Sequence, residues 1–145
     1  MSLKIVSARG ELLEQWRAVH NNVNLAVQLT AEEVAERAFR HHLTLAYIGG
    51  VLVGNATVRA PDDGGVTAIV RILPAYRRRG LGSEYLEAIM KQVRSSHPDQ
   101  INTIVLAANL DGLTFAQRHG FVETERYEIE GVAYIGLTRH DTTSL

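Results

Sequence analysis

The sequence contains no cysteine among its 145 residues. Without thiols the chain has no disulfide, no thiolate metal site and no cysteine nucleophile, and this absence suits a reducing compartment. Long apolar runs are also missing, since a membrane helix needs about 20 apolar residues and the runs here are far shorter. The first ten residues, MSLKIVSARG, lack the apolar stretch of a signal peptide. We therefore expect a cytoplasmic protein with no membrane partner.

An excess of either charge is lacking too. The chain carries 15 basic and 16 acidic side chains, for a net charge of −1. No overall positive field points to nucleic acid as a partner, so the cluster Arg77–Arg79 needs a local explanation. The six histidines are scattered. His41 and His42 are adjacent and on a helix would point in different directions, whereas metal-binding pairs lie four residues apart. We expect no metal site.

The first forty residues predict one strand and two helices. Alternating residues predict a short strand over Leu3–Ala8, and apolar spacing predicts a helix from Glu11 to about Val23. Thr30 followed three residues later by Glu33 is the signature of a capping box that opens a second helix. The apolar stripe expected on that second helix consists of Val34, Ala35, Ala38 and Phe39.

The middle of the chain changes to a β period. Three β-rich runs follow one another at Leu43–Ile48, Val51–Ala60 and Val66–Leu73. Gly49-Gly50 is a hairpin signal, Pro61–Gly65 is a second turn, and Pro74 stops the third run because it has no N–H for a ladder. These features predict an antiparallel meander.

The last part of the chain predicts alternating helices and strands. A helix begins at Gly80 and ends near residues 95–98, with one apolar side formed by Leu81, Tyr85, Leu86, Ile89, Met90 and Val93. Ile101–Ala107 is an apolar run of the kind that is buried on both faces. The helix between this run and Val66–Leu73 makes the two strands parallel neighbours. A short helix from Asn109 to Gly120 and two strands, Phe121–Ile129 and Val132–Thr138, close the chain.

The predicted order is β-α-α-β-β-β-α-β-α-β-β within one domain over residues 1–145. This order indicates an α+β fold with three layers, α/β/α. Its sheet is mixed but mostly antiparallel, has six to seven strands and is flanked by about four helices.

The segment Arg77-x-x-Gly80-x-Gly82 has the chemistry of an anion site. The first N–H groups of a helix have no partner within the helix, and the helix dipole adds partial positive charge there. Glycines at 80 and 82 let a diphosphate approach the backbone, Ser83 adds a hydroxyl, and arginine can bind phosphate in a two-point fork. The segment is neither a Walker P-loop nor a dinucleotide fingerprint, because both motifs need residues that are absent here.

In its context this segment resembles the GNAT superfamily of acyl-CoA-dependent N-acetyltransferases. Residues 70–86, VRILPAYRRRGLGSEYL, are similar to the family core V-x-P-x-x-R-x-x-G-x-G-x-x-L, with Ile72 at the valine position. The block from Asn109 to Gly120-Phe121 resembles the family's downstream N…G-F segment. The resemblance implies acetyl-CoA as co-substrate and direct acetyl transfer, in a ternary complex, to a primary amine of a small molecule or peptide. A homodimer through an edge of the C-terminal strands is a further option.

The resemblance also implies which residues bind the cofactor: Ile72, Leu73, Pro74, Arg77, Arg78, Arg79, Gly80, Leu81, Gly82, Ser83 and Asn109. Backbone groups of residues 72–74 would meet the pantetheine arm and the acyl carbonyl, in a V-shaped opening between splayed strands. The N–H groups of residues 78–83 would hold the pyrophosphate. Asn109 would touch the pantetheine region, although its position is equally that of a simple helix N-cap.

The expected catalytic groups are partly missing. Alignment of the N…G-F segment puts Ala116 where the family often has a tyrosine that protonates the leaving thiolate. No residue of Val66–Leu73 is acidic, and Asp62-Asp63 is typical of a plain turn. Tyr127 and Tyr134 on the last two strands are the candidate catalytic residues, with a role as ordinary sheet residues as the alternative. These gaps leave a second hypothesis open, a catalytically weak or inactive acyl-CoA-binding regulatory module.

Other polar side chains have simpler interpretations. Tyr76 and Tyr85 flank the phosphate turn, and His119 is placed to stabilise a helix C-terminus. His20, together with Asn21, Asn22 and Asn24, lies where the family's acceptor usually binds. Turn propensity favours a polar, solvated loop there instead.

Overall fold

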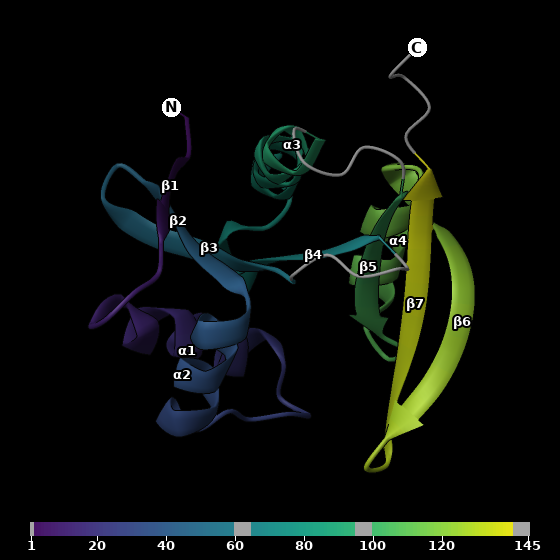
Figure 1. The fold of residues 1–145 in the computed structure, drawn as a ribbon. Coiled ribbons are helices and arrows are strands. Elements are labelled where there is room, and N and C mark those ends of the chain that lie inside the picture. Colours follow the sequence, from purple (N-terminus) through teal and green to yellow (C-terminus); the bar gives the residue numbers. More distant parts are fainter. Residues whose placement is uncertain (1, 60–64, 95–99, 141–145) are drawn as a thin grey trace.

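The computed structural model describes residues 2–59, 65–94 and 100–140. In this part of the chain one mixed sheet has seven strands in the order β1-β2-β3-β4-β5-β7-β6 (Figure 1). The strands are β1 (Lys4–Ser7), β2 (His42–Ile48), β3 (Val51–Val58), β4 (Val66–Ile72), β5 (Gln100–Leu106), β6 (Val122–Ile129) and β7 (Val132–His140). The helices are α1 (Leu12–Val23), α2 (Ala31–Arg40), α3 (Leu81–Arg94) and α4 (Leu110–Arg118), and a 3₁₀ turn spans Pro74–Tyr76.

The layers follow from which helices cover which face. Figure 1 shows α1 and α2 on one side of the β1–β4 part of the sheet and α3 on the other. All strand pairs are antiparallel except β4 with β5. The predicted element order, the mixed and mostly antiparallel sheet and the parallel neighbours are therefore confirmed. None of the helices described here is both long and apolar enough to cross a bilayer.

The feature that positions the site is the short contact between β4 and β5. They pair only at Val66↔Ile101 and Thr67↔Asn102, and beyond these residues the two parts of the sheet diverge (Figure 1). Gly65 permits the contact: its φ is +100°, and a Cβ there would lie 2.5 Å from the carbonyl oxygen of Gln100. The sheet thus opens as a V, as the family resemblance implies.

Two apolar clusters pack on opposite faces of the β1–β4 part of the sheet. On one face, the α3 side chains Tyr85, Leu86, Ile89, Met90 and Val93 are buried against the strands. On the other face Trp16 of α1 is fully buried, and its Nε1 donates to the carbonyl oxygen of Ala56 at 3.1 Å. Asn55 Nδ2 donates in return to the Trp16 carbonyl oxygen at 2.9 Å. This pair of hydrogen bonds ties α1 to β3.

The capping prediction for the second helix is confirmed, and the predicted apolar stripe is partly wrong. Thr30 Oγ1 accepts from Glu33 N, and the Glu33 carboxylate accepts from Thr30 N. Val34 is buried, but Phe39 is 91% exposed. Successive helical residues are about 100° apart, so Phe39 lies about 140° around the helix from Val34. Arg37, only about 60° from Val34, faces the protein instead.

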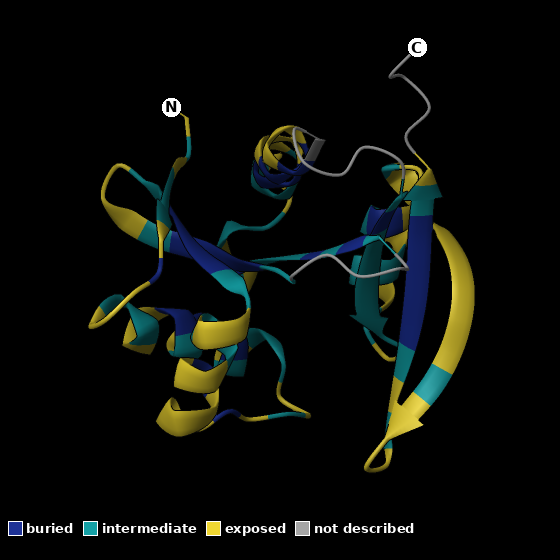
Figure 2. Ribbon diagram, viewed as in Figure 1, coloured by how far each residue is buried: buried dark blue, intermediate teal, exposed yellow. Residues whose placement is uncertain are grey.

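The prediction that Ile101–Ala107 is buried on both faces is also wrong. Ile101 is buried, whereas the residues after it are half-buried. The reason is the divergence of β4, which leaves this edge of β5 facing the opening of the V. On the other side of β5, the neighbouring strand β7 is buried along its middle, and the edge strand β6 is largely exposed (Figure 2).

Candidate functional site

A cavity of about 1270 Å³ lies in the opening of the V. Seven of the predicted cofactor-binding residues line it: Ile72, Arg77, Arg78, Gly80, Gly82, Ser83 and Asn109. Four do not, namely Leu73, Pro74, Arg79 and Leu81. Tyr127 and Tyr134 from the β6–β7 hairpin line the same cavity. The fold thus brings the predicted cofactor turn and the candidate catalytic residues together around one space.

The turn before α3 presents unpaired backbone donors. Arg78 and Gly80 have left-handed backbones, with φ of +65° and +77°, and left-handed residues next to a helix start form anion-binding concavities. The first backbone hydrogen bond of α3 runs from Glu84 N to Gly80 O at 3.1 Å. Within the described residues, the N–H groups of residues 81–83 therefore make no backbone hydrogen bond. This turn has the donor set that a diphosphate needs.

Gly82 has a packing reason to be glycine as well. A Cβ at this position would lie 3.2 Å from Cε1 of Phe115 and 3.6 Å from Cγ1 of Ile72. The start of α3 therefore contacts the Phe115 ring of α4 at close range. A larger side chain at 82 would push either into this ring or into the cavity.

The three consecutive arginines differ in their surroundings. Arg77 Nε donates to the carbonyl oxygen of Ile72 at 2.9 Å, so its side chain closes the turn onto the end of β4. Arg79 lies over the Tyr76 ring, 5.7 Å from its centroid, and is not part of the cavity wall. Arg78 is exposed and lines the cavity. Of the three arginines, Arg78 therefore combines an exposed side chain with a place in the cavity wall.

Ser83 and Asn109 each have a partner. Ser83 Oγ lies 3.0 Å from His119 Nε2, which links the start of α3 to the end of α4. His119 is the C-cap residue of α4, as expected, and also contacts the Phe115 ring. Asn109 Oδ1 accepts from Gly112 N at 3.0 Å, which confirms it as the N-cap of α4.

The candidate catalytic tyrosines form a pair. Tyr127 and Tyr134 lie directly opposite each other on β6 and β7, and their rings stack with centroids 5.6 Å apart. Burial raises the pKa of the Tyr127 phenol above its ordinary value, so the hydroxyl is protonated at neutral pH. Ala116 is buried at the cavity wall and offers no proton. Tyr85 is buried away from the cavity, with its hydroxyl 2.5 Å from Thr44 Oγ1, and is structural.

His20 is not in a solvated loop, and that prediction is wrong. The residue belongs to α1, is 4% exposed and stacks on Trp16, because the helix continues to Val23 and packs on the sheet. Asn21 Oδ1 accepts from Leu29 N at 2.8 Å and lies 3.1 Å from His20 Nδ1. His20 Nδ1 is therefore the donor, and Nε2 carries the lone pair. Burial, followed by the charge of Arg71, lowers the pKa of His20 to about 4, so the ring is neutral at pH 7.

Three arginines that sequence reasoning did not assign also line the cavity: Arg37, Arg59 and Arg71. Arg71 lies over the Trp16 ring at 5.5 Å, with Nη1 3.2 Å from Asn55 Oδ1. Burial, and next the charge of Arg37, lowers the pKa of Arg71 to about 10. The sequence signal for this group was Arg71 itself, the single charged residue in the strand Val66–Leu73.

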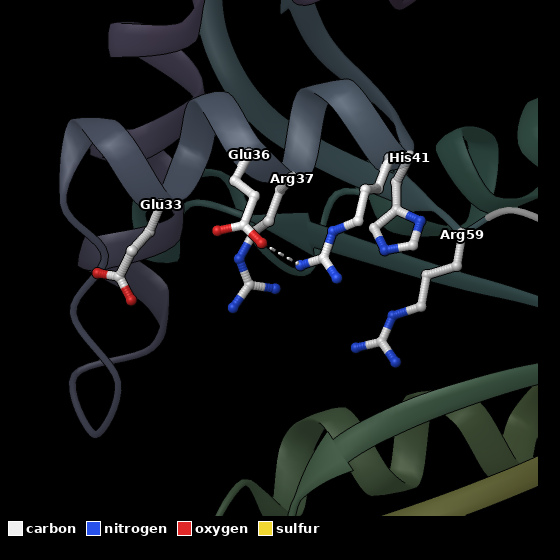
Figure 3. A pocket seen from close by; sticks show the side chains of 6 residues that line it. Glu33, Glu36, Arg37, His41 and Arg59 are labelled. Carbon is white, nitrogen blue, oxygen red and sulfur yellow. Dashed lines mark ion pairs between the residues drawn. The ribbon is translucent and has the colours of Figure 1, made fainter.

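A smaller cavity of about 300 Å³ adjoins the larger one, and Arg37, Arg59 and Glu33 line both. Figure 3 shows this smaller cavity beside α2, with the guanidinium groups of Arg37 and Arg59 extending into the same open space. The residues described here contain no cluster of three or more possible metal ligands. Asp62 and Asp63 lie outside the described residues.

Comparison with known proteins agrees with this geometry. The model of the acetyltransferase (GNAT) family matches residues 7–121. The chain belongs to the GNAT acetyltransferase family. A Bacillus subtilis (strain 168) protein whose name assigns it, provisionally, to the acetyltransferases is 28% identical over 102 residues, which cover 70% of this chain and 67% of that protein.

Solved structures of the family share the fold. The ribosomal-protein-S18-alanine N-acetyltransferase from Escherichia coli superimposes with a TM-score of 0.78 at 17% identity, covering 99% of this chain and 96% of that one. Arabidopsis thaliana Naa50, solved with the bisubstrate analogue CoA-Ac-MVNAL, gives a TM-score of 0.77 at 21% identity, covering 96% of this chain and 99% of that one. At these identities the likeness extends to the GNAT fold and not to the acceptor.

Proposed function

We propose that this GNAT protein transfers an acetyl group from acetyl-CoA to a primary amine of a small molecule or peptide, directly and within a ternary complex. The observation that carries the proposal is the single cavity lined both by the turn at Gly80–Ser83 and by Tyr127 and Tyr134. One space open to both substrates allows the amine to reach the thioester without an acylated enzyme. The chain also has no cysteine to carry an acyl group. Naa50, with its CoA-peptide analogue, is a precedent for a peptide acceptor in this fold.

Acetyl-CoA would lie along the V. The unpaired N–H groups of residues 81–83 would hold the pyrophosphate, with Arg78 as the nearest cation. At the end of β4, backbone groups of Ile72 would meet the pantetheine arm, and Asn109 lines the same cavity, whereas Leu73 and Pro74 lie outside its wall. Arg77 would act indirectly, because its Nε holds the Ile72 carbonyl oxygen. The cofactor supplies the activated acyl group, and the chain supplies orientation.

The reaction needs balanced proton movements. The neutral amine nitrogen attacks the thioester carbonyl carbon, a C–N bond forms, and the C–S bond breaks with its electron pair on sulfur. The amine loses a proton to water, and the thiolate gains one. We assign that donation first to Tyr134, because it lies opposite Leu106 of β5, another residue of the cavity wall. Tyr127 stacks on it and is the second candidate. Juxtaposition of amine and thioester supplies much of the remaining rate.

A second candidate function is an acyl-CoA-binding regulatory module with little or no catalysis. The observation that favours it is Ala116, a buried methyl group at the cavity wall in the segment where the family often has an acid. In this alternative the protein binds acyl-CoA at the same site but does not catalyse acetyl transfer.

Two measurements on the full chain separate these functions. Calorimetry with coenzyme A and acetyl-CoA tests the cofactor site, and thiol release with a panel of primary amines tests transfer. Binding together with turnover on any amine supports the acetyltransferase. Tight binding without turnover on any amine supports the regulatory module, and no binding overturns both. A single domain over residues 1–145, a homodimer through the β6 edge and a cytoplasmic location stay predictions.

A further inference from the structure

The part of the cavity lined by α1, α2, the end of β3, β4 and the β6–β7 hairpin, called here the acceptor part, gathers three guanidinium groups from separate elements. Arg37 comes from α2, Arg59 directly follows β3, and Arg71 comes from β4. Arg59 lowers the pKa of Arg37, and both lower the pKa of Arg71, so the three charges lie close enough to repel one another. Figure 3 shows Arg37 and Arg59 extending toward the same space. The cluster is therefore a concentrated positive charge inside a cavity wall.

Within the part of the chain that the structure describes, few protein groups compensate this positive charge. The side chains of Arg37 and Arg59 make no hydrogen bond or ion pair with another residue in ranges 2–59, 65–94 and 100–140. Arg71 bonds only neutral groups there, with Nη1 3.2 Å from Asn55 Oδ1 and 3.4 Å from Thr57 Oγ1.

The described carboxylates beside the cluster, Glu33 and Glu36, have other hydrogen-bond or ion-pair partners, and of the two only the charge of Glu33 acts on Arg37, whose pKa it raises. Glu33 Oε1 accepts from Thr30 N at 2.9 Å as part of the capping box, and Glu36 pairs with Arg40 at 3.1 Å. Half-buried like charges without partners are unfavourable for folding. Such an arrangement is typical of a binding site in which a ligand supplies the opposite charge.

We propose that Arg37, Arg59 and Arg71 bind an anionic group, a carboxylate or a phosphonate, on a small acceptor amine. The inference rests on the proposed acetyltransferase function and names its substrate class. Guanidinium groups bind planar carboxylates and phosphoryl groups through paired charge-assisted hydrogen bonds. The acceptor is small because Arg71 lies against Trp16 at the cavity wall, so the anion must enter the cavity to reach it.

The position of the cluster fits an amine directed at the thioester. Arg37 interacts electrostatically with Tyr134, and Arg59 with Tyr127. An anion held by the arginines therefore leaves the rest of a short molecule beside the tyrosine pair. His20 lines the same part of the cavity. Its ring is neutral, so it adds no positive charge beside the amine.

The test compares matched amines that differ only in charge. Thiol release at saturating acetyl-CoA is measured for an amino acid and its carboxamide, and for an aminoalkyl phosphonate and its neutral diester. We expect kcat/KM to be at least tenfold higher for one or both anionic amines than for the neutral partner. Preference for the carboxylate or the phosphonate then identifies the anion.

Arginine variants test whether the cluster of Arg37, Arg59 and Arg71 causes the preference for anionic amines. Arg59→Gln and Arg37→Gln should each lower kcat/KM for the anionic amine at least tenfold and leave that of its neutral partner within twofold. The control is Arg126→Gln, since Arg126 is exposed on β6, pairs with Glu123 and does not line the cavity. Thermal unfolding and coenzyme A affinity should stay unchanged in every variant, which separates a lost acceptor site from a lost fold or cofactor site.

Direct binding keeps the inference testable if no amine is turned over. Calorimetry of the carboxylate and phosphonate amines with the coenzyme A-bound protein should show binding that Arg59→Gln abolishes. Equal kcat/KM for charged and neutral amines would overturn the inference while leaving the acetyltransferase intact. So would the absence of binding by both anions, or equal losses for charged and neutral amines in the arginine variants.

Discussion

The two parts of the cavity are built in different ways. The proposed cofactor part comes mainly from one short stretch, from the end of β4 through the turn to Ser83, and offers mostly backbone N–H groups. The proposed acceptor part consists of side chains from α1, α2, the end of β3, β4 and the β6–β7 hairpin. A backbone site needs only glycines and a helix start and can be kept while other residues change. A side-chain site depends on each residue that reaches it, so it is where specificity can differ within one fold.

The largest effect should come from the tyrosine pair, at the boundary between the two parts. Tyr134→Phe is expected to lower kcat about 100-fold, because general acid–base groups contribute at least that factor. Its KM and coenzyme A affinity should not change. Tyr127→Phe should have a smaller effect, since this ring stacks on Tyr134. Steady-state thiol release measures both, and a wild-type kcat in Tyr134→Phe would assign the proton to water.

The next effect concerns stability of the acceptor part and involves His20. The pKa of this buried ring is about 4 in the fold, below the usual value of 6.5. Between these values the unfolded chain binds more protons than the native one, so stability rises with pH over this window and falls on acidification. Going from pH 6.5 to 5 should cost about 2 kcal/mol from this residue.

Urea unfolding at several pH values measures this loss. His20→Gln should reduce the pH dependence between 6.5 and 5, whereas His140→Gln, at an exposed position, should leave it as in the wild type. An unaltered pH dependence in His20→Gln would show that the ring is not held neutral by burial.

The cofactor part is tested by Gly82→Val. The branched side chain should obstruct the approach of the diphosphate and press on the Phe115 ring, where even a Cβ would lie 3.2 Å from Cε1. Acetyl-CoA affinity should fall at least tenfold in calorimetry, with a cooperative thermal transition retained. Ala88→Val, on the exposed face of the same helix, is the control. Unchanged affinity in Gly82→Val would remove the pyrophosphate from this turn.

The smallest effect separates the two roles of Asn109. Asn109→Ala removes the cap bond to Gly112 and should cost about 1 kcal/mol of unfolding free energy. A side chain that also contacts the pantetheine would add a severalfold loss of coenzyme A affinity, which a pure cap would not. Chemical denaturation and calorimetry on the same variant distinguish these outcomes.

Features that depend on neighbours in the chain were predictable. The capping box at Thr30, the N-cap at Asn109 and the start of α3 after Gly80 are all observed, because a helix end is decided within one turn. Phe39 shows where this reasoning stops. Its exposure depends on which face of α2 meets the sheet, and an apolar residue near the edge of a stripe carries no such information.

The acceptor site shows the same limit more fully. Local chemistry predicts an anion site at the turn Arg77–Ser83, because the unpaired N–H groups and the absent side chains belong to seven consecutive residues. No local pattern brings Arg37, Arg59 and Arg71 to one cavity or buries His20 beside them. The packing of α1 and α2 on the sheet and the divergence of β4 from β5 do so. Contacts between residues distant in the chain are set by the whole core, and this is why only the tertiary structure reveals the acceptor side.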